Sequence, residues 1–127
     1  MGKVNIAESL YLITNDKKSF PYSNSLFVDD EAKVLVDTGS QSAQLKKISS
    51  ECKIDILINS HYHIDHVRGN WIFPNAALWA PSQDALAINS FEKFLEMTGF
   101  KSSPELTEYF GKMKADFFDK RQNVKVK

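Results

Sequence analysis

Three histidines and one aspartate fall within six consecutive residues of this 127-residue chain. They are His61, His63, Asp65 and His66, and the chain contains no other histidine. Imidazole nitrogens and carboxylate oxygens are ligands of transition metals. Buried together without an ion, these groups would repel one another or keep unpaired lone pairs. The pattern therefore predicts a metal site, and the competing interpretation is a polar surface loop that carries histidines.

The spacing of this histidine motif predicts two neighbouring ions rather than one. Side chains two residues apart share a face in an extended segment, so His61, His63 and Asp65 project to one side if the chain stays extended. Asp65 is also a good helix N-cap, and a helix starting there would turn His66 in a second direction. We expect His61 and His63 to bind the first ion, and Asp65 and His66 to bind the second.

Zinc is the expected ion, with iron or manganese as alternatives, because the motif combines imidazole and carboxylate without a nearby thiolate. Two or three protein ligands for each ion leave room for a water molecule, whose pKa falls toward ~7 on binding. Ligating histidines also need hydrogen-bond acceptors behind them. Asp37, at the end of another predicted strand, is the expected acceptor.

The elements that would position the motif follow an α/β order. Apolar, β-favouring runs occupy residues 4–14, 25–28 and 33–36, with polar turns between them. Residues 40–50 fit a short helix, and residues 54–58 are a nearly continuous apolar run typical of a strand covered on both faces. This order predicts a βαβ crossover, with the motif at the carboxyl end of the second strand, where ligand sites of α/β sheets gather.

The rest of the chain has a helical character. Apolar residues at helical spacing fill residues 82–120, with a break between two short helices at 89–90. Ser103 before Pro104 is a strong helix start. Residues 123–127 alternate like the beginning of a strand. The aromatic residues of this helical segment predict core packing, with an apolar wall for a substrate as the alternative.

Composition argues against several classes of partner. Sixteen basic and sixteen acidic residues cancel and are mixed along the chain, which disfavours a nucleic acid or an anionic membrane bound by bulk charge. No segment approaches the ~20 apolar residues of a membrane span, and the N-terminus has no apolar leader. Cys52 is the only cysteine, so we expect no internal disulfide and a small, buried, hydrophobic role for it. A single domain over residues 1–127, in the cytoplasm, is the expectation.

The motif and its surroundings resemble a known family. Residues 61–66 match the His-x-His-x-Asp-His motif of the metallo-β-lactamase-fold hydrolases. Residues 24–28 and 34–39, the latter ending in Asp-Thr-Gly, look like the N-terminal strands and turn of that superfamily, and residues 73–80 are similar to its next strand. The resemblance covers about residues 4–81.

The resemblance implies a fold, a reaction and roles for the motif residues. The fold would be the N-terminal half of an αββα sandwich, a mixed sheet with flanking helices, without the C-terminal half. The reaction would be hydrolysis of a small-molecule ester, thioester, lactone, lactam or phosphodiester by a metal-activated water. His61 and His63 would match ligands of the first metal, and Asp65 and His66 ligands of the second, with Asp65 also orienting the water. Arg68 departs from the paired glycines of many thioesterase-like members.

The family pattern also needs ligands that this chain does not supply. It includes a later histidine for the first metal, a bridging aspartate and a last histidine for the second metal, whereas no histidine follows His66. The chain would then be a truncated N-terminal half, a small protein that binds metal without turnover, or a half-site completed by dimerisation or by a partner chain. An isolated half would expose an apolar sheet face. We expect weak metal binding and little hydrolase activity from the chain alone.

Overall fold

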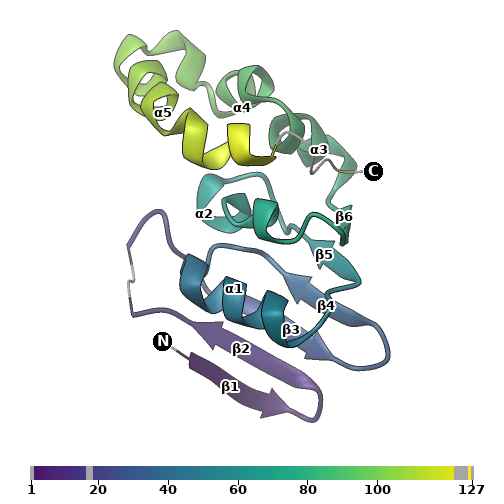
Figure 1. The fold of residues 1–127 in the computed structure, drawn as a ribbon. Helices are drawn as coiled ribbons and strands as arrows, with labels where there is room; N and C mark the ends of the chain where they lie inside the picture. Colours follow the sequence, from purple (N-terminus) through teal and green to yellow (C-terminus); the bar gives the residue numbers. More distant parts are fainter. Residues whose placement is uncertain (1, 17–18, 122–125, 127) are drawn as a thin grey trace.

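The computed structural model describes residues 2–16, 19–121 and 126. Within them lies one six-stranded sheet in the order β1-β2-β3-β4-β5-β6, with helices beside it and beyond its β6 edge (Figure 1). The strands are β1 (Gly2–Ala7), β2 (Leu10–Thr14), β3 (Ser25–Asp29), β4 (Lys33–Val36), β5 (Ile56–Ile58) and β6 (Ala77–Trp79). The helices are α1 (Ser42–Glu51), α2 (Ile64–Val67), α3 (Ser82–Asn89), α4 (Phe91–Thr98) and α5 (Pro104–Phe117). Short 3-10 turns are η1 (Asn70–Ile72), η2 (Phe100–Ser102) and η3 (Asp119–Arg121). The predicted α/β class is confirmed.

The sheet is mixed, with an antiparallel part followed by a parallel part. β1 to β4 pair antiparallel in sequence order, whereas β4, β5 and β6 are parallel neighbours. The connection from β4 through α1 to β5 is the predicted βαβ crossover. The carboxyl ends of β4, β5 and β6 therefore share one edge of the sheet. The histidine motif begins three residues after Ile58, at this edge.

The run at residues 4–14 is divided into two strands, a hairpin that the pattern did not predict. The connection lies at Glu8 and Ser9, between β1 and β2. The side-chain amide of Asn5 donates a hydrogen bond to the carbonyl of Ala7 at 2.7 Å and so supports the turn locally. Two-residue connections are the commonest in hairpins, and the pairing of β1 with β2 shifts register between Asn5 and Ala7, just before this connection.

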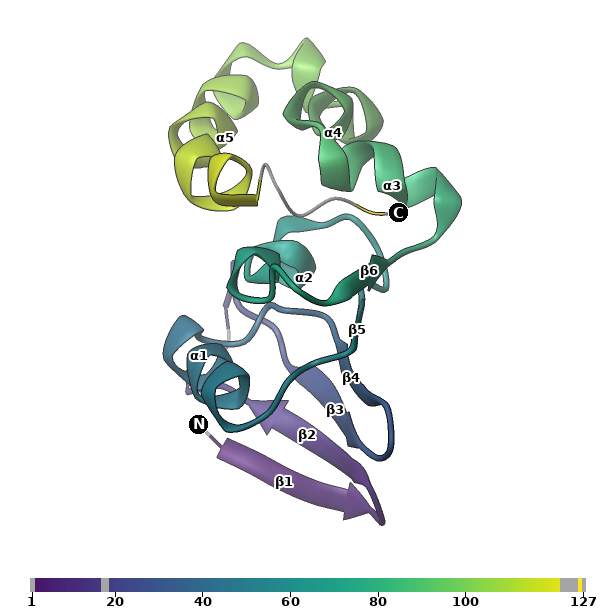
Figure 2. The ribbon, with the colours of Figure 1, turned by 45° about the vertical axis from the view of Figure 1, so that its right-hand side comes forward.

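α1 covers one face of the sheet (Figure 2). Its Leu45 and Ile48 belong to the main core cluster together with Phe27, Leu35 and Leu57, which come from the three central strands. Because side chains alternate along a strand, these residues all point to the α1 side and are buried. Burial of this face holds β4 and β5, and hence their carboxyl ends, in place.

The opposite face of the sheet is apolar but less buried. Cross-strand partners run across five strands from Leu12 through Leu26, Val36 and Ile58 to Trp79. None of these five side chains is buried, and Trp79 is 54% exposed. A continuous apolar row with access to solvent is unusual for a sheet that is complete by itself. We call this row the open sheet face.

The helices after β6 surround a second, aromatic core cluster. Phe94 of α4, Phe110 of α5 and Phe118 are buried there with Ile64 of α2. This cluster therefore joins the helical segment to the histidine motif. None of the described helices is both long and apolar enough to cross a membrane.

Local sequence determines where these helices begin. The Ser103 hydroxyl accepts a hydrogen bond from the backbone N–H of Leu106, and Pro104 is the first residue of α5, as the sequence predicts. The predicted break at 89–90 is present, because Ser90 ends α3 and caps α4. The alternation predicted for 123–127 lies outside the described residues, apart from Val126.

Candidate metal centre

The three histidine rings lie together just beyond the carboxyl end of β5. The ring centroids of His61 and His66 are 4.1 Å apart, and those of His61 and His63 are 4.7 Å apart. Nε2 of His66 is 3.5 Å from Oδ2 of Asp65. The four residues singled out by the motif therefore form one cluster, with His61 between the other two rings.

The chain turns into a helix within the motif, the alternative to an extended segment, but the expectation that Asp65 caps this helix is wrong. His63 is the N-cap of α2, so Asp65 lies inside the helix. The helix forms here because Ile64 and Val67, three residues apart, both bury their side chains, and one helical turn places them on the same face. Asp65 and His66 therefore take their directions from α2, whereas His61 belongs to the preceding loop.

Asp37 lies directly behind two of the histidines. Its Oδ2 accepts hydrogen bonds from Nδ1 of His66 at 2.9 Å and from the Ser60 hydroxyl at 2.6 Å, and its Oδ1 accepts from the Ser60 backbone N–H at 2.7 Å. The Ser60 hydroxyl is also 2.8 Å from Nδ1 of His61. Because that hydroxyl gives its single proton to Asp37, it acts as the acceptor toward His61.

This hydrogen-bond system assigns the tautomers of two histidines. His61 and His66 each carry a proton on Nδ1, which leaves the Nε2 lone pair available. Metal-ligating histidines have this arrangement, with a carboxylate or another acceptor behind the ring. Two imidazole Nε2 atoms beside a carboxylate are a donor set whose chemistry fits zinc, iron or manganese.

The described part of the chain contains no group of three or more His, Cys, Asp or Glu side chains arranged to hold an ion. The histidine motif is therefore a partial donor set in this structure. The division of ligands between two ions stays a prediction.

The electrostatic surroundings of the two oriented histidines differ. The hydrogen bond to Asp37 raises the pKa of His66, against its partial burial, and the charges of Asp37 and Asp65 also raise it. Burial lowers the pKa of His61, and the neighbouring His66 and His63 lower it further. His61 is therefore the ring that more readily stays neutral, which is the form that can bind a metal.

Asp37 has an unusual backbone conformation. Its φ of 65° lies in the left-handed region, and it is the one non-glycine residue with positive φ in the described ranges. Its backbone N–H donates to the Ile58 carbonyl at 2.7 Å, so the end of β4 stays paired to β5 while the chain turns. Such conformations are uncommon outside glycine and gather at functional sites.

Arg68, expected from the resemblance to be a departure, joins two segments of the site. Its buried guanidinium donates to the carbonyls of Pro21 at 3.0 Å, Gly39 at 3.1 Å and Ser40, and it lies 4.4 Å from the Tyr22 ring centroid. Burial lowers the pKa of this guanidinium. Arg68 thus fixes the loops on either side of β3 and β4 against the end of α2.

A buried polar network that sequence reasoning missed lies beneath the cluster. Asn59, Asn70 and Thr38 are fully buried. The Asn70 amide donates to Asn59 Oδ1 at 2.7 Å, and the Thr38 hydroxyl donates to Asn70 Oδ1 at 2.7 Å. The Thr38 backbone N–H donates to the His66 carbonyl at 2.8 Å. The network ties the ends of β4 and β5 to α2 and η1.

A cavity of about 280 Å³, the aromatic cavity, borders the histidine motif. His63, Ile64 and Asp65 form one side of it. The remaining wall comes from Thr98 and from four phenylalanines, Phe20, Phe94, Phe100 and Phe110.

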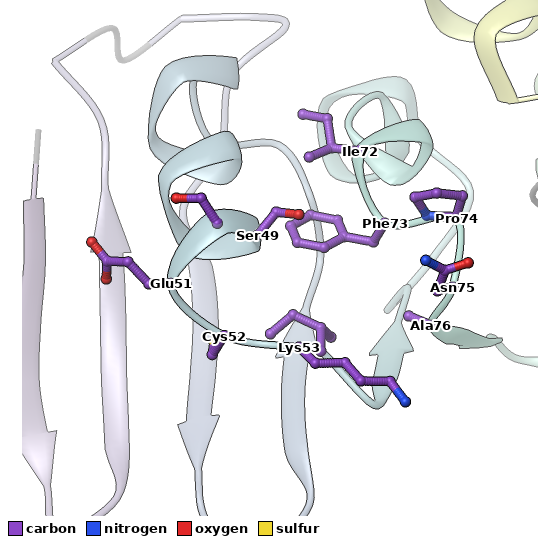
Figure 3. A pocket seen from close by; sticks show the side chains of 11 residues that line it. Ser49, Glu51, Cys52, Lys53, Ile72, Phe73, Pro74, Asn75 and Ala76 are labelled. Carbon is purple, nitrogen blue, oxygen red and sulfur yellow. The ribbon is translucent and has the colours of Figure 1, made fainter.

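A larger cavity of about 370 Å³ lies at the other end of the parallel strands, between the end of α1 and the segment that leads into β6 (Figure 3). Its wall includes Phe73 and the partly buried Cys52, which packs against the main core. Burial raises the pKa of the Cys52 thiol, so the thiolate is disfavoured. This cavity is separated from the histidine motif by the length of β5.

Comparison with known proteins agrees with the motif. The family model of the metallo-beta-lactamase superfamily matches residues 19–112, which include the whole histidine motif and most of the helical segment. A probable metallo-hydrolase from Methanocaldococcus jannaschii is 34% identical over an alignment of 68 residues, and the match covers 48% of this chain and 34% of that protein. The chain thus spans about a third of the length of this curated relative.

Proposed function

The chain belongs to the metallo-beta-lactamase superfamily, and on that premise we propose that it provides metal ligands and a catalytic carboxylate to a metal-dependent hydrolase. The observation that carries this proposal is the hydrogen-bond system of Asp37 and Ser60, which leaves Nε2 of His61 and His66 free to bind an ion. Zinc suits these donors best, and iron or manganese are the alternatives.

The residues of the motif have separate roles in this proposal. His61 and His63 would hold the first ion, and Asp65 and His66 would hold the second. When bound, such an ion supplies Lewis acidity and lowers the pKa of a nucleophilic water. The Asp65 carboxylate would accept a hydrogen bond from the attacking water and orient it. Asp37 acts one step further back, because it keeps the His66 ring, and through Ser60 the His61 ring, in the binding tautomer.

The proposed reaction is hydrolysis of an ester, thioester, lactone, lactam or phosphodiester in a small molecule. The oxygen of one water forms a bond to the electrophilic carbon or phosphorus, and the bond to the leaving group breaks. One proton of the water passes to the leaving group, and Asp65 is placed to relay it.

Turnover of one substrate from each class, with zinc and with a chelator, tests the proposal. We expect low turnover that requires zinc and falls at least ~100-fold in Asp65→Asn, because a positioned acid–base group contributes about that much. Asp30→Asn, in the exposed β3–β4 turn, is the matched control and should keep wild-type turnover. Turnover that survives both the chelator and Asp65→Asn would overturn the proposal.

A second candidate function is that of a catalytically weak metal-binding module completed by dimerisation or by a partner chain. The open sheet face favours it, since an apolar row with access to solvent invites association. Size-exclusion chromatography with and without zinc separates the two candidates. A dimer that forms only with zinc supports completion by a second copy, whereas a monomer that turns over substrate excludes it.

A further inference from the structure

We propose that the aromatic cavity binds a compact, uncharged apolar group of the substrate, and that this group is an aryl or branched-alkyl group attached next to the bond that is hydrolysed. This inference rests on the proposed function and narrows it. It excludes charged groups and long unbranched acyl chains from this cavity.

The aromatic cavity directly borders the proposed catalytic group. His63 and Asp65 form part of its wall, with the buried Ile64 between them. A group seated in the cavity therefore places the bond attached to it beside the Asp65 carboxylate. The larger cavity, at the other end of β5, is not lined by any residue of the histidine motif.

The phenylalanine wall is packed before any ligand arrives. Phe100 stacks on Phe110 with ring centroids 4.9 Å apart and an 8° angle between planes. Phe94 and Phe20 approach Phe110 edge-on, at 5.5 Å and 6.3 Å. Rings that already hold one another lose little freedom when they bind an apolar group.

The size of the cavity limits its occupant. Whole drug-sized ligands occupy pockets of roughly 300–1,000 Å³, and this cavity has about 280 Å³. It therefore suits one ring or a branched alkyl group with a short linker, while the reacting bond stays outside, at the histidine motif.

The polarity of the wall selects an uncharged group. Neither lysine nor arginine is among the described residues that line the cavity, and Asp65 carries the negative charge there. Lys101, next to Phe100 in sequence, pairs instead with Glu92 and Glu96. A charged group seated in the cavity would therefore meet a carboxylate and no cationic side chain in the wall.

The hydroxyl of Thr98 does not change this polarity. It donates to the carbonyls of Phe94 at 2.8 Å and Leu95 at 3.2 Å, and it accepts from the Phe100 backbone N–H at 3.2 Å. Because its hydrogen bonds are made within α4 and η2, the hydroxyl leaves this side of the wall apolar in effect.

Two substitutions and a matched control test the cavity. Phe20 and Tyr109 are both 48% exposed aromatic residues, and Phe20 lines the cavity whereas Tyr109, next to Phe110 in α5, does not. Phe20→Ala should remove part of the wall without emptying a core position, and Tyr109→Ala is its control. Thr98→Phe should fill the cavity.

The probe is 4-fluorophenylacetone, an uncharged aryl ketone without a hydrolysable bond, observed by fluorine NMR with a chelator present. We expect wild type and Tyr109→Ala to bind it equally. Phe20→Ala should bind it about three- to tenfold more weakly, because the probe then buries less apolar surface against the wall. Thr98→Phe should not bind it, and phenyl phosphate should bind to wild type more weakly than the ketone does.

Equal binding by wild type, Phe20→Ala and Thr98→Phe would overturn the proposal, and so would equal weakening in Tyr109→Ala. Tighter binding of phenyl phosphate would overturn the selection for an uncharged group. Because the probe is not hydrolysed and no metal is added, failure of the proposed hydrolysis leaves this result unchanged. Zinc-dependent turnover by a chain that does not bind the probe would overturn the proposed role of the cavity and would support the proposed hydrolysis.

Discussion

At the scale of single residues, Asp37 organises the candidate metal centre. One carboxylate serves His66 directly and His61 through Ser60. Its left-handed backbone turns the chain away from the sheet at this point while the main-chain pairing to Ile58 continues. The sequence pattern singles out Asp37 by its place at a strand end, but the relay through Ser60 depends on a loop 23 residues later in the chain.

Asp37→Asn separates the charge of this residue from its shape. Asparagine tolerates the left-handed conformation, so the backbone is retained. Its single carbonyl oxygen cannot accept all three hydrogen bonds, and the orientation of both rings weakens. We expect zinc affinity to fall about 10- to 100-fold, measured by competition with a chromophoric chelator. Asp30→Asn should bind as wild type does, and equal affinity of Asp37→Asn and wild type would contradict this role.

The candidate ligands could be predicted because their types and spacing are local in sequence. The contacts that hold these ligands in place could not be predicted from the sequence. Arg68 reaches a carbonyl 47 residues away and leaves no pattern, since every residue has a carbonyl. The pairing of Asn59 with Asn70 likewise requires the fold to bring η1 under β5. Asp84 accepts the Tyr62 backbone N–H at 3.0 Å and orders the motif loop from α3, a role that spacing does not suggest.

At the scale of elements, the loop after β4 packs against α2 with no space for a side chain. A Cβ on Gly39 would lie 1.8 Å from the Asp65 carbonyl oxygen and 2.0 Å from the Ser23 hydroxyl oxygen. The Ser23 hydroxyl donates to that same Asp65 carbonyl. The backbone of the proposed catalytic residue is therefore held by direct contact with the Asp-Thr-Gly turn.

Gly39→Ala should lower the free energy of unfolding by about 1–3 kcal/mol, the usual cost of overpacking. The reason is that backbone atoms must move to accept the methyl group. Gly111→Ala is the matched control. It lies inside α5, and a Cβ there meets nothing within 4 Å. We expect it to raise the free energy of unfolding by roughly 0.5–1 kcal/mol through helix propensity. Urea denaturation measures both, and equal stability of Gly39→Ala and wild type would contradict the contact.

Cys52, where α1 ends, gives a pH-dependent test of packing. Burial raises the pKa of its thiol, so at neutral pH the native chain holds less thiolate than the unfolded chain does. We expect iodoacetamide to modify native Cys52 more slowly than the urea-unfolded thiol. The two rates should converge as the pH rises past the raised pKa. Equal rates at neutral pH would show that α1 does not bury this thiol.

The elements with strong local patterns could be predicted, and the others could not. The cap of α5 at Ser103 and the strand β5 follow from neighbouring residues alone. The expectation that this strand is covered on both faces is wrong, because Leu57 is buried under α1 whereas the two isoleucines of the strand are only partly buried. The four-residue helix α2 follows instead from tertiary burial of Ile64 and Val67, which competes with the polar character of the motif. Alternation of polar and apolar residues is too short there to indicate either conformation.

At the scale of the whole molecule, the two faces of the sheet differ. α1 buries one face in the main core, while the open sheet face presents an apolar row from Leu12 to Trp79. Packing a second layer on such a row is how sheets normally bury it. In a solution of the purified chain, a second copy of the chain is what can pack against the open sheet face.

We therefore expect the purified chain to self-associate through the open sheet face. Trp79→Lys should raise the dissociation constant at least about tenfold, since a tryptophan at a buried interface commonly contributes more than 1 kcal/mol. Leu86→Lys is the control, because Leu86 is 58% exposed, similar to Trp79 at 54%, and lies on α3. Sedimentation velocity measures both variants. A wild-type chain that stays monomeric at high concentration would contradict the expectation.

Metal binding through Nε2 of His61 and His66 is the property on which the proposed function depends. With three histidines in the chain, ring-nitrogen NMR during a zinc titration can follow each one, with His61→Ala and His66→Ala for assignment. We predict Nδ1–H tautomers in His61 and His66 before zinc, and zinc-induced shifts at their Nε2 atoms with Nδ1 still protonated. Ring signals that do not change at saturating zinc, or zinc on Nδ1 of either ring, would contradict this mode of binding.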